Sequence, residues 1–136
     1  MKKIFLDTNI FIDLLTDREI KKIDIEKLEQ YLHKSLVYIS VLSVHIAYYV
    51  LKIKPNSTTH EKVQKLISLM NLVSLSEITT VLTLKTFNKD FEDTLQYYSA
   101  IESGCEKILT RDIKDYNSIK RNIPSNIHIV SSLEEI

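Results

Sequence analysis

Short apolar runs alternate with longer stretches of helical periodicity along the chain. Five runs are three or four residues long and nearly wholly apolar, namely 3–6, 36–39, 72–75, 107–109 and 127–130. Runs this short, without regular polar alternation, are typical of parallel β-strands that are covered on both faces.

The stretches between these runs carry apolar residues at helical spacing. Three of them place their apolar residues on one helix face, namely 25–33, 59–70 and 90–103. Thr58 followed by Glu61 has the form of a capping box, which predicts the start of the second of these helices. A further stretch, 41–52, is apolar almost all round. Helices that alternate with strands predict βαβ units and a parallel sheet with helices on both faces.

The length of 136 residues is that of one ordinary domain, and no repeat, linker or low-complexity tract divides the chain. We therefore expect a single domain over 1–136. The one cysteine, Cys105, excludes an internal disulfide framework and a cysteine-rich zinc site. The first apolar run is too short for a signal peptide and charges interrupt the later ones, so we expect a cytoplasmic protein without a membrane span.

Charge and glycine content exclude several ways of binding nucleotides and nucleic acids. Eighteen basic residues balance eighteen acidic ones, so the chain has no global basic field for nucleic acid. Gly104 is the single glycine, so neither a Walker loop nor a Rossmann fingerprint can be written in this sequence.

Acidic residues follow two of the predicted strands. Asp7 comes directly after the first run, and Asp112 follows the fourth run by three residues. Functional groups gather at the carboxyl ends of parallel strands, so these two acids are expected to face one crevice. Asp90 and Asp93, three residues apart, share one face of the helix predicted over 90–103.

Each acid also has a purely structural interpretation. Asp7 could cap the helix that begins near Asn9, and Asp90 could cap its own helix. Asp112 could lie in a turn or cap the short segment IKDY, and Asp115 is typical of a surface residue. If the acids do cluster, they repel one another unless a cation neutralises them, and oxygen-only ligands favour Mg²⁺ or Mn²⁺ over zinc. A real cluster would therefore indicate metal-assisted phosphate chemistry.

Three segments occur in the order FLDTNIFIDLL, ISVLSVHIAYYVL and DFEDTLQYYSAIESGCEKILTRDIKDY. Together they resemble PIN domains, in particular the small bacterial ones that include VapC-type toxins. The resemblance implies a three-layer α/β/α fold with a five-stranded parallel sheet. It also implies a Mg²⁺- or Mn²⁺-dependent ribonuclease, a hydrolase that acts on phosphodiester bonds.

The resemblance assigns roles to individual residues. It implies three catalytic, metal-ligating acids, Asp7, Asp93 and Asp112. Supporting or alternative polar residues are Asn9, Ser40, His45, Asp90, Thr110 and Asp115. After Ser40, where the family's motif carries a glutamate, this chain has His45, so one acid is missing. His45 could ligate Mn²⁺ or pack among Val41, Tyr48 and Tyr49, and Glu77, Asp90 or Asp115 could supply the missing charge.

The resulting hypothesis is a hydrolytic ribonuclease that cleaves single-stranded RNA and is the toxin of a toxin–antitoxin pair. Arg111 and Lys114 are expected to contact the RNA backbone, and a small antitoxin is the implied protein partner. The apolar stretch 41–52 predicts either a buried core helix or a surface for a homodimer or the antitoxin. The alternative is a catalytically idle PIN-like module that binds RNA or protein, which His45 and the zero net charge favour.

Overall fold

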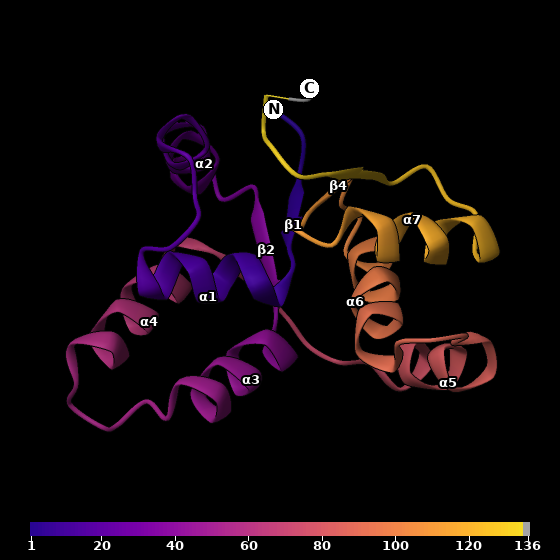
Figure 1. Cartoon of the computed structure of the whole chain (residues 1–136), viewed down its shortest axis with the longest axis horizontal. Coiled ribbons are helices and arrows are strands. Elements are labelled where there is room, and N and C mark those ends of the chain that lie inside the picture. Colours follow the sequence, from indigo (N-terminus) through magenta and orange to yellow (C-terminus); the bar gives the residue numbers. More distant parts are fainter. Residues whose placement is uncertain (135–136) are drawn as a thin grey trace.

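The fold consists of five short strands and seven helices within residues 1–134, the part of this computed structural model that is described (Figure 1). The strands are β1 (Ile4–Leu6), β2 (Val37–Ser40), β3 (Asn71–Val73), β4 (Lys107–Leu109) and β5 (His128–Val130). The helices are α1 (Thr8–Thr16), α2 (Lys22–His33), α3 (Val41–Leu51), α4 (Thr58–Leu69), α5 (Glu77–Thr86), α6 (Phe91–Glu102) and α7 (Ile113–Asn122).

All strand pairs are parallel, and the strands lie in the order β3-β2-β1-β4-β5. The chain starts in the middle of the sheet, adds β2 and β3 on one side, and then crosses over to add β4 and β5 on the other. The order therefore reverses between β1 and β4. In open parallel sheets, ligands bind outside the carboxyl ends of the strands at such a switch point.

The core lies on both faces of this sheet because successive side chains of a strand point to opposite sides. Ile4 and Leu6 belong to one buried cluster, which also contains residues of α1, α2, α3 and α4. Phe5 belongs to a second cluster with residues of α6 and α7. Figure 1 shows α1 on one side of β1 and α6 and α7 on the other. The predicted three-layer α/β/α fold with five parallel strands is confirmed.

Two helices differ from the prediction. The apolar pattern predicts no helix at α5, whose sequence EITTVLTLKT is rich in β-branched residues of low helix propensity. The helix forms because one side of it packs against α6, where Thr79 and Thr83 are buried. At α7, the sequence predicted at most a short segment after Asp112, whereas the helix continues to Asn122 and buries Tyr116.

The predicted capping box of α4 is wrong. The N-cap is Ser57, whose hydroxyl accepts a hydrogen bond from the backbone N–H of His60 at 3.1 Å. Thr58 is already the first helical residue, so its side chain is not at the position that satisfies the free N–H groups of the first turn.

Much of the apolar surface of α3 is not in the core. Ser43 and Ala47 are its buried residues, whereas Tyr49 is 80% exposed and Val50 is 55% exposed. The expectation that this helix is buried in the monomer core is therefore wrong for Tyr49 and Val50, although Tyr48 and Leu51 pack against the core. Among the described helices, none combines the length and the apolar character needed to cross a membrane.

Candidate metal centre

The acidic site is built at the switch point of the sheet. Leu6 of β1 pairs in register with Leu109 of β4, so the residues that follow them leave the sheet together. These residues are Asp7 and Thr110. Asp112 follows two residues later, and its backbone N–H donates to the Thr110 hydroxyl at 2.9 Å. The predicted meeting of the two strand-end acids follows directly from this pairing.

Asp7 is buried and fully engaged in hydrogen bonds. Its carboxylate accepts from the backbone N–H of Thr8 at 2.8 Å, from the Thr110 hydroxyl at 2.7 Å and from the Tyr116 hydroxyl at 2.9 Å. It is the N-cap of α1, as the structural interpretation proposed. Burial raises the pKa of Asp7 above its ordinary value although the three hydrogen bonds act in the opposite direction.

Three further carboxylates approach one another beside Asp7. One oxygen from each of Asp93, Asp112 and Asp115 lies within 4.8 Å of the others. Asp93 is in the first turn of α6, Asp112 is at the N-cap position of α7, and Asp115 is in the first turn of α7. The N-terminal ends of two helices therefore face the cluster, and their dipoles favour negative charge there.

Asp93 lies at the centre of this negative charge. Burial, and then the charges of Asp7, Asp90, Glu92 and Asp112, raise its pKa to about 8. Without a cation, the side chain therefore holds a proton at neutral pH. A bound divalent cation would take the place of that proton, because it removes the repulsion that keeps the carboxyl group neutral.

The acid group fits a hard divalent cation. Its donors are carboxylate oxygens, the ligand type that Mg²⁺ and Mn²⁺ prefer. Asp93 is buried, whereas Asp112 and Asp115 are exposed, so the group is anchored on one side and open to solvent on the other. This opening leaves room for water and substrate.

Among the supporting residues of the prediction, Asn9 and Thr110 contact the acids. The Asn9 amide donates to Asp112 at 3.2 Å and lies 3.5 Å from the Thr110 hydroxyl. Asp90 is the N-cap of α6 and accepts from the backbone N–H of Asp93 at 2.8 Å, so it positions that acid and adds charge to it. Ser40 instead caps α3, where its hydroxyl accepts from a backbone N–H.

The candidates for the missing acid, and His45, lie at different places in the structure. Asp115 has its carboxylate in the cluster. Glu77 is the first residue of α5, and the neighbouring Ser76 donates a hydrogen bond to Glu102. Glu102 is the last residue of α6, whereas Asp93 is in its first turn, so Glu77 lies away from the site. His45 is exposed on α3, so the expectation that it is packed into the apolar surroundings of that helix is wrong.

Two polar features of the site are absent from the sequence prediction. Glu92 has a raised pKa, caused by burial and then by the charge of Asp7, which places it beside the predicted acids. The run of acids in DFED was the available signal. Gln96 is fully buried and donates to Thr8 at 2.8 Å and to Ser43 at 2.7 Å, so it ties α6 to α1 and α3 beneath the site.

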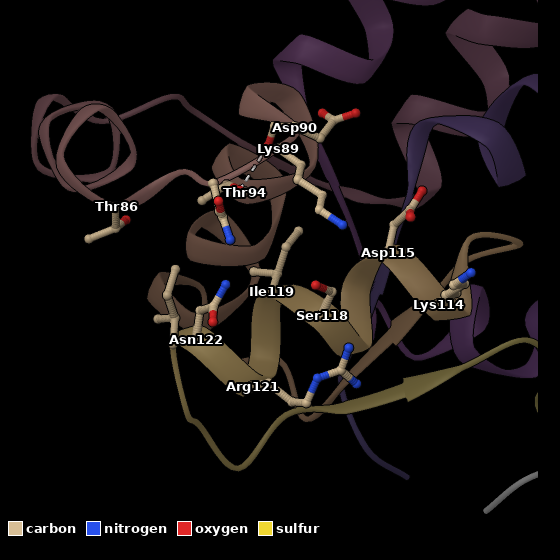
Figure 2. A pocket seen from close by; sticks show the side chains of 12 residues that line it. Thr86, Lys89, Asp90, Thr94, Lys114, Asp115, Ser118, Ile119, Arg121 and Asn122 are labelled. Carbon is tan, nitrogen blue, oxygen red and sulfur yellow. Dashed lines mark hydrogen bonds between the residues drawn. The ribbon is translucent and has the colours of Figure 1, made fainter.

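The two predicted RNA contacts have different surroundings. Arg111 forms ion pairs of 2.8 Å with Asp13 and with Glu19, so its guanidinium already has two carboxylate partners. These contacts give it a role in joining β4 to α1. Lys114 lies beside Asp115 at the edge of a hollow between α6 and α7 (Figure 2).

Comparisons with known proteins agree with the fold. A family model described as PIN domain matches residues 3–114, a range that includes Asp7, Asp93 and Asp112. Ribonuclease VapC1 from Aquifex aeolicus (strain VF5) is 27% identical over 124 residues, which cover 85% of this chain and 85% of that protein.

A similar fold is also found among solved structures. The crystal structure of VapBC2 from Rickettsia felis, bound to a DNA fragment from the promoter, contains a chain that matches with a TM-score of 0.72. The match covers 93% of this chain and 96% of that chain, at 19% sequence identity. With a family model that spans most of its length, a matching fold and the acids at the strand ends, this chain belongs to the PIN domain family.

Proposed function

We propose that this protein is a Mg²⁺- or Mn²⁺-dependent ribonuclease that cleaves single-stranded RNA and is the toxin of a toxin–antitoxin pair. The observation that carries the proposal is the group of acids at the β1–β4 switch point, in a PIN domain with sequence similarity to a VapC ribonuclease. The relative's name supports RNA as substrate, and the VapBC2 complex supports an antitoxin as partner.

Several acids together would hold the cation. Asp93, Asp112 and Asp115 would hold it, with Asp7 behind them. When bound, such an ion supplies an activated water and stabilises negative charge on a phosphodiester. Thr110 and Tyr116 keep the Asp7 carboxylate in one orientation. The exposed side of the group admits RNA as a single strand, which can bend toward the acids.

Removal of the metal should abolish activity without unfolding the protein. We expect cleavage of a labelled single-stranded RNA with Mg²⁺ or Mn²⁺, none with EDTA, and recovery when the metal is restored in excess. Circular dichroism should be unchanged by EDTA, because the core lies on the two faces of the sheet and the acids lie at its edge. Cleavage that persists in EDTA would indicate a contaminating nuclease or a metal-free mechanism.

The alternative function is an idle PIN module that binds RNA or protein without cutting. The observation that favours it is His45 at the position where an acid was expected. Calorimetric titration with Mn²⁺ separates the two functions. An active enzyme should bind Mn²⁺ with an affinity that depends on Asp93, whereas an idle module should give no such heat.

A second copy of the chain is the proposed partner for the exposed apolar surface of α3 and α5. Tyr49 and Val50 on α3, and Ile78 and Leu84 on α5, are between 55% and 80% exposed. In Figure 1 both helices lie along the lower edge of the molecule. Large apolar side chains that stay exposed on a helix are candidates for an interaction surface.

The Tyr49→Glu variant is expected to weaken this association by roughly tenfold or more, because it places a charge in an apolar contact. Light scattering over a range of concentrations should show the wild type approaching twice its mass of 15.9 kDa and the variant remaining a monomer. Ile23→Glu on α2, also at an exposed apolar position, is the matched control. A wild type that stays monomeric at all concentrations would contradict the homodimer.

A further inference from the structure

We infer that the hollow between α6 and α7 is a binding subsite for the phosphates of the RNA strand, through Lys89, Lys114 and Arg121. The inference rests on the proposed ribonuclease function and specifies on which side of the acid group the RNA backbone lies. It replaces Arg111 with side chains that are free to bind an anion.

The hollow adjoins the acid group. Its volume is about 230 Å³, below the roughly 300–1,000 Å³ of pockets that enclose a drug-sized ligand, so it suits part of a longer ligand. Asp90 and Asp115 line it and also belong to the acidic site. A strand whose reacting phosphate is at the acids therefore has its neighbouring nucleotides beside this hollow.

Three cationic side chains surround the hollow, namely Lys89, Lys114 and Arg121. Figure 2 shows Lys89 extending toward α7 from the start of α6, with Arg121 on the α7 side. All three are exposed, and within residues 1–134 none forms an ion pair with a carboxylate. Cations without partners beside an acidic site are available to an anionic ligand.

The spacing of the cationic side chains along α7 suits an extended RNA strand. Lys114 and Arg121 are seven residues apart, so they share a helix face at a separation of about 10 Å along the axis. This spacing is of the same order as that between neighbouring phosphates along an extended strand. Ser118 lies between them on the same face and also lines the hollow. Successive phosphates of an extended strand would meet these side chains in turn.

The lining of the hollow favours backbone recognition over base recognition. Its remaining polar residues include Asn88, Asn122 and Thr94, and its apolar ones are Ile119 and Ile123. No aromatic ring lines it among the described residues, and stacking on aromatic rings is how proteins usually hold single-stranded bases. Binding through phosphates alone carries little sequence information.

The test measures binding in EDTA, where cleavage does not interfere. The probe is a fluorescein-labelled single-stranded RNA of about twelve nucleotides, followed by anisotropy between roughly 50 and 200 mM KCl. Lys89→Gln, Lys114→Gln and Arg121→Gln should each weaken binding by roughly threefold to tenfold, and the triple variant should lower the salt slope by about 2. Single-stranded DNA of the same length should show the same losses, because its phosphates are the same.

The control is Lys65→Gln on α4. This helix contacts α1 and β3 and lies on the other side of the molecule from α7 (Figure 1). It should bind as the wild type does. A triple variant with wild-type affinity and salt slope overturns the subsite, even if the wild type cleaves RNA with metal. If the wild type does not cleave but the variants lose binding, the ribonuclease proposal fails and the subsite stands.

Discussion

The Asp93→Asn variant is expected to lose RNA cleavage by roughly a thousandfold and, in the absence of metal, to be more stable than the wild type at pH 8. The loss of activity follows because the amide cannot replace a charged ligand in the acid group. The gain in stability follows because the charges around Asp93 raise its pKa from 3.8 to about 8. A neutral, isosteric side chain removes that repulsion.

The direction of the pH dependence follows from the raised pKa. An acid that binds its proton more tightly in the folded state stabilises the fold at low pH, and this contribution is lost as the pH rises through the folded-state pKa. The metal-free wild type should therefore lose stability between about pH 4 and pH 8, and Asp93→Asn should lose less. At pH 8 we expect the variant to melt higher by on the order of 5 °C.

Thermal melts in EDTA at pH 5 and pH 8, together with cleavage assays in Mn²⁺, test both effects in the same preparation. Glu26→Gln on α2 removes an exposed negative charge away from the site and is the control for net charge. A variant that cleaves RNA at the wild-type rate would refute the role of Asp93 in the reaction. A variant that melts lower than the wild type at pH 8 would refute the repulsion.

The Asp7→Ala variant is expected to lose both cleavage and stability, by about 2–3 kcal/mol at pH 5. Alanine leaves the hydroxyls of Tyr116 and Thr110 without their acceptor and removes the cap of α1. Buried donors without acceptors and lost caps are among the largest single-residue costs to a fold. Urea unfolding followed by circular dichroism measures the change in the free energy of unfolding.

Two companion measurements show whether the hydrogen bonds are the cause. Tyr116→Phe in the Asp7→Ala background should cost less than it does in the wild type, because its donor has already lost its acceptor. Burial also raises the pKa of Asp7, so the stability it confers declines as the pH rises. The deficit of Asp7→Ala should therefore be smaller at pH 8 than at pH 5. A variant with wild-type stability at pH 5 would contradict the buried position of this carboxylate.

The two substitutions are expected to have opposite effects on stability although both remove an acid of one site. Asp7 is held by donors from three directions, so its removal breaks a network. Asp93 is surrounded by other carboxylates, so its removal relieves repulsion. Sites that hold like charges together commonly trade stability for activity.

Local sequence was sufficient to predict a parallel sheet and the two acids that follow β1 and β4. Each strand is a short, mainly apolar run that the pattern identifies directly. A side chain that closely follows a parallel strand must lie at the carboxyl edge of the sheet. Asp7 and Asp112 could therefore be placed at one crevice from the sequence. The PIN resemblance, which the family comparison confirmed, extended that expectation to Asp93.

The helices were harder to predict where their stability comes from contacts rather than from pattern. Helix α5 has no clear apolar stripe, and it is helical because α6 covers its buried threonines. On α3, the exposure of Tyr49 and Val50 could likewise not be predicted, because the segment is apolar almost all round. In both cases the deciding interaction joins residues far apart in the chain.

The sequence alone predicted a parallel α/β fold from periodicity, the acids Asp7 and Asp112 from their places after two strands, and the PIN family from the resemblance of its motifs. The tertiary structure decided that Asp115 joins Asp93 and Asp112, that Arg111 is engaged by Asp13 and Glu19, and that a cationic hollow adjoins the acids. The ion pairs of Arg111 depend on how the segment after β4 meets α1. The acid group and the hollow depend on how α6 and α7 are oriented against the sheet. That orientation is set by side-chain packing between distant segments, and spacing along one segment does not encode it.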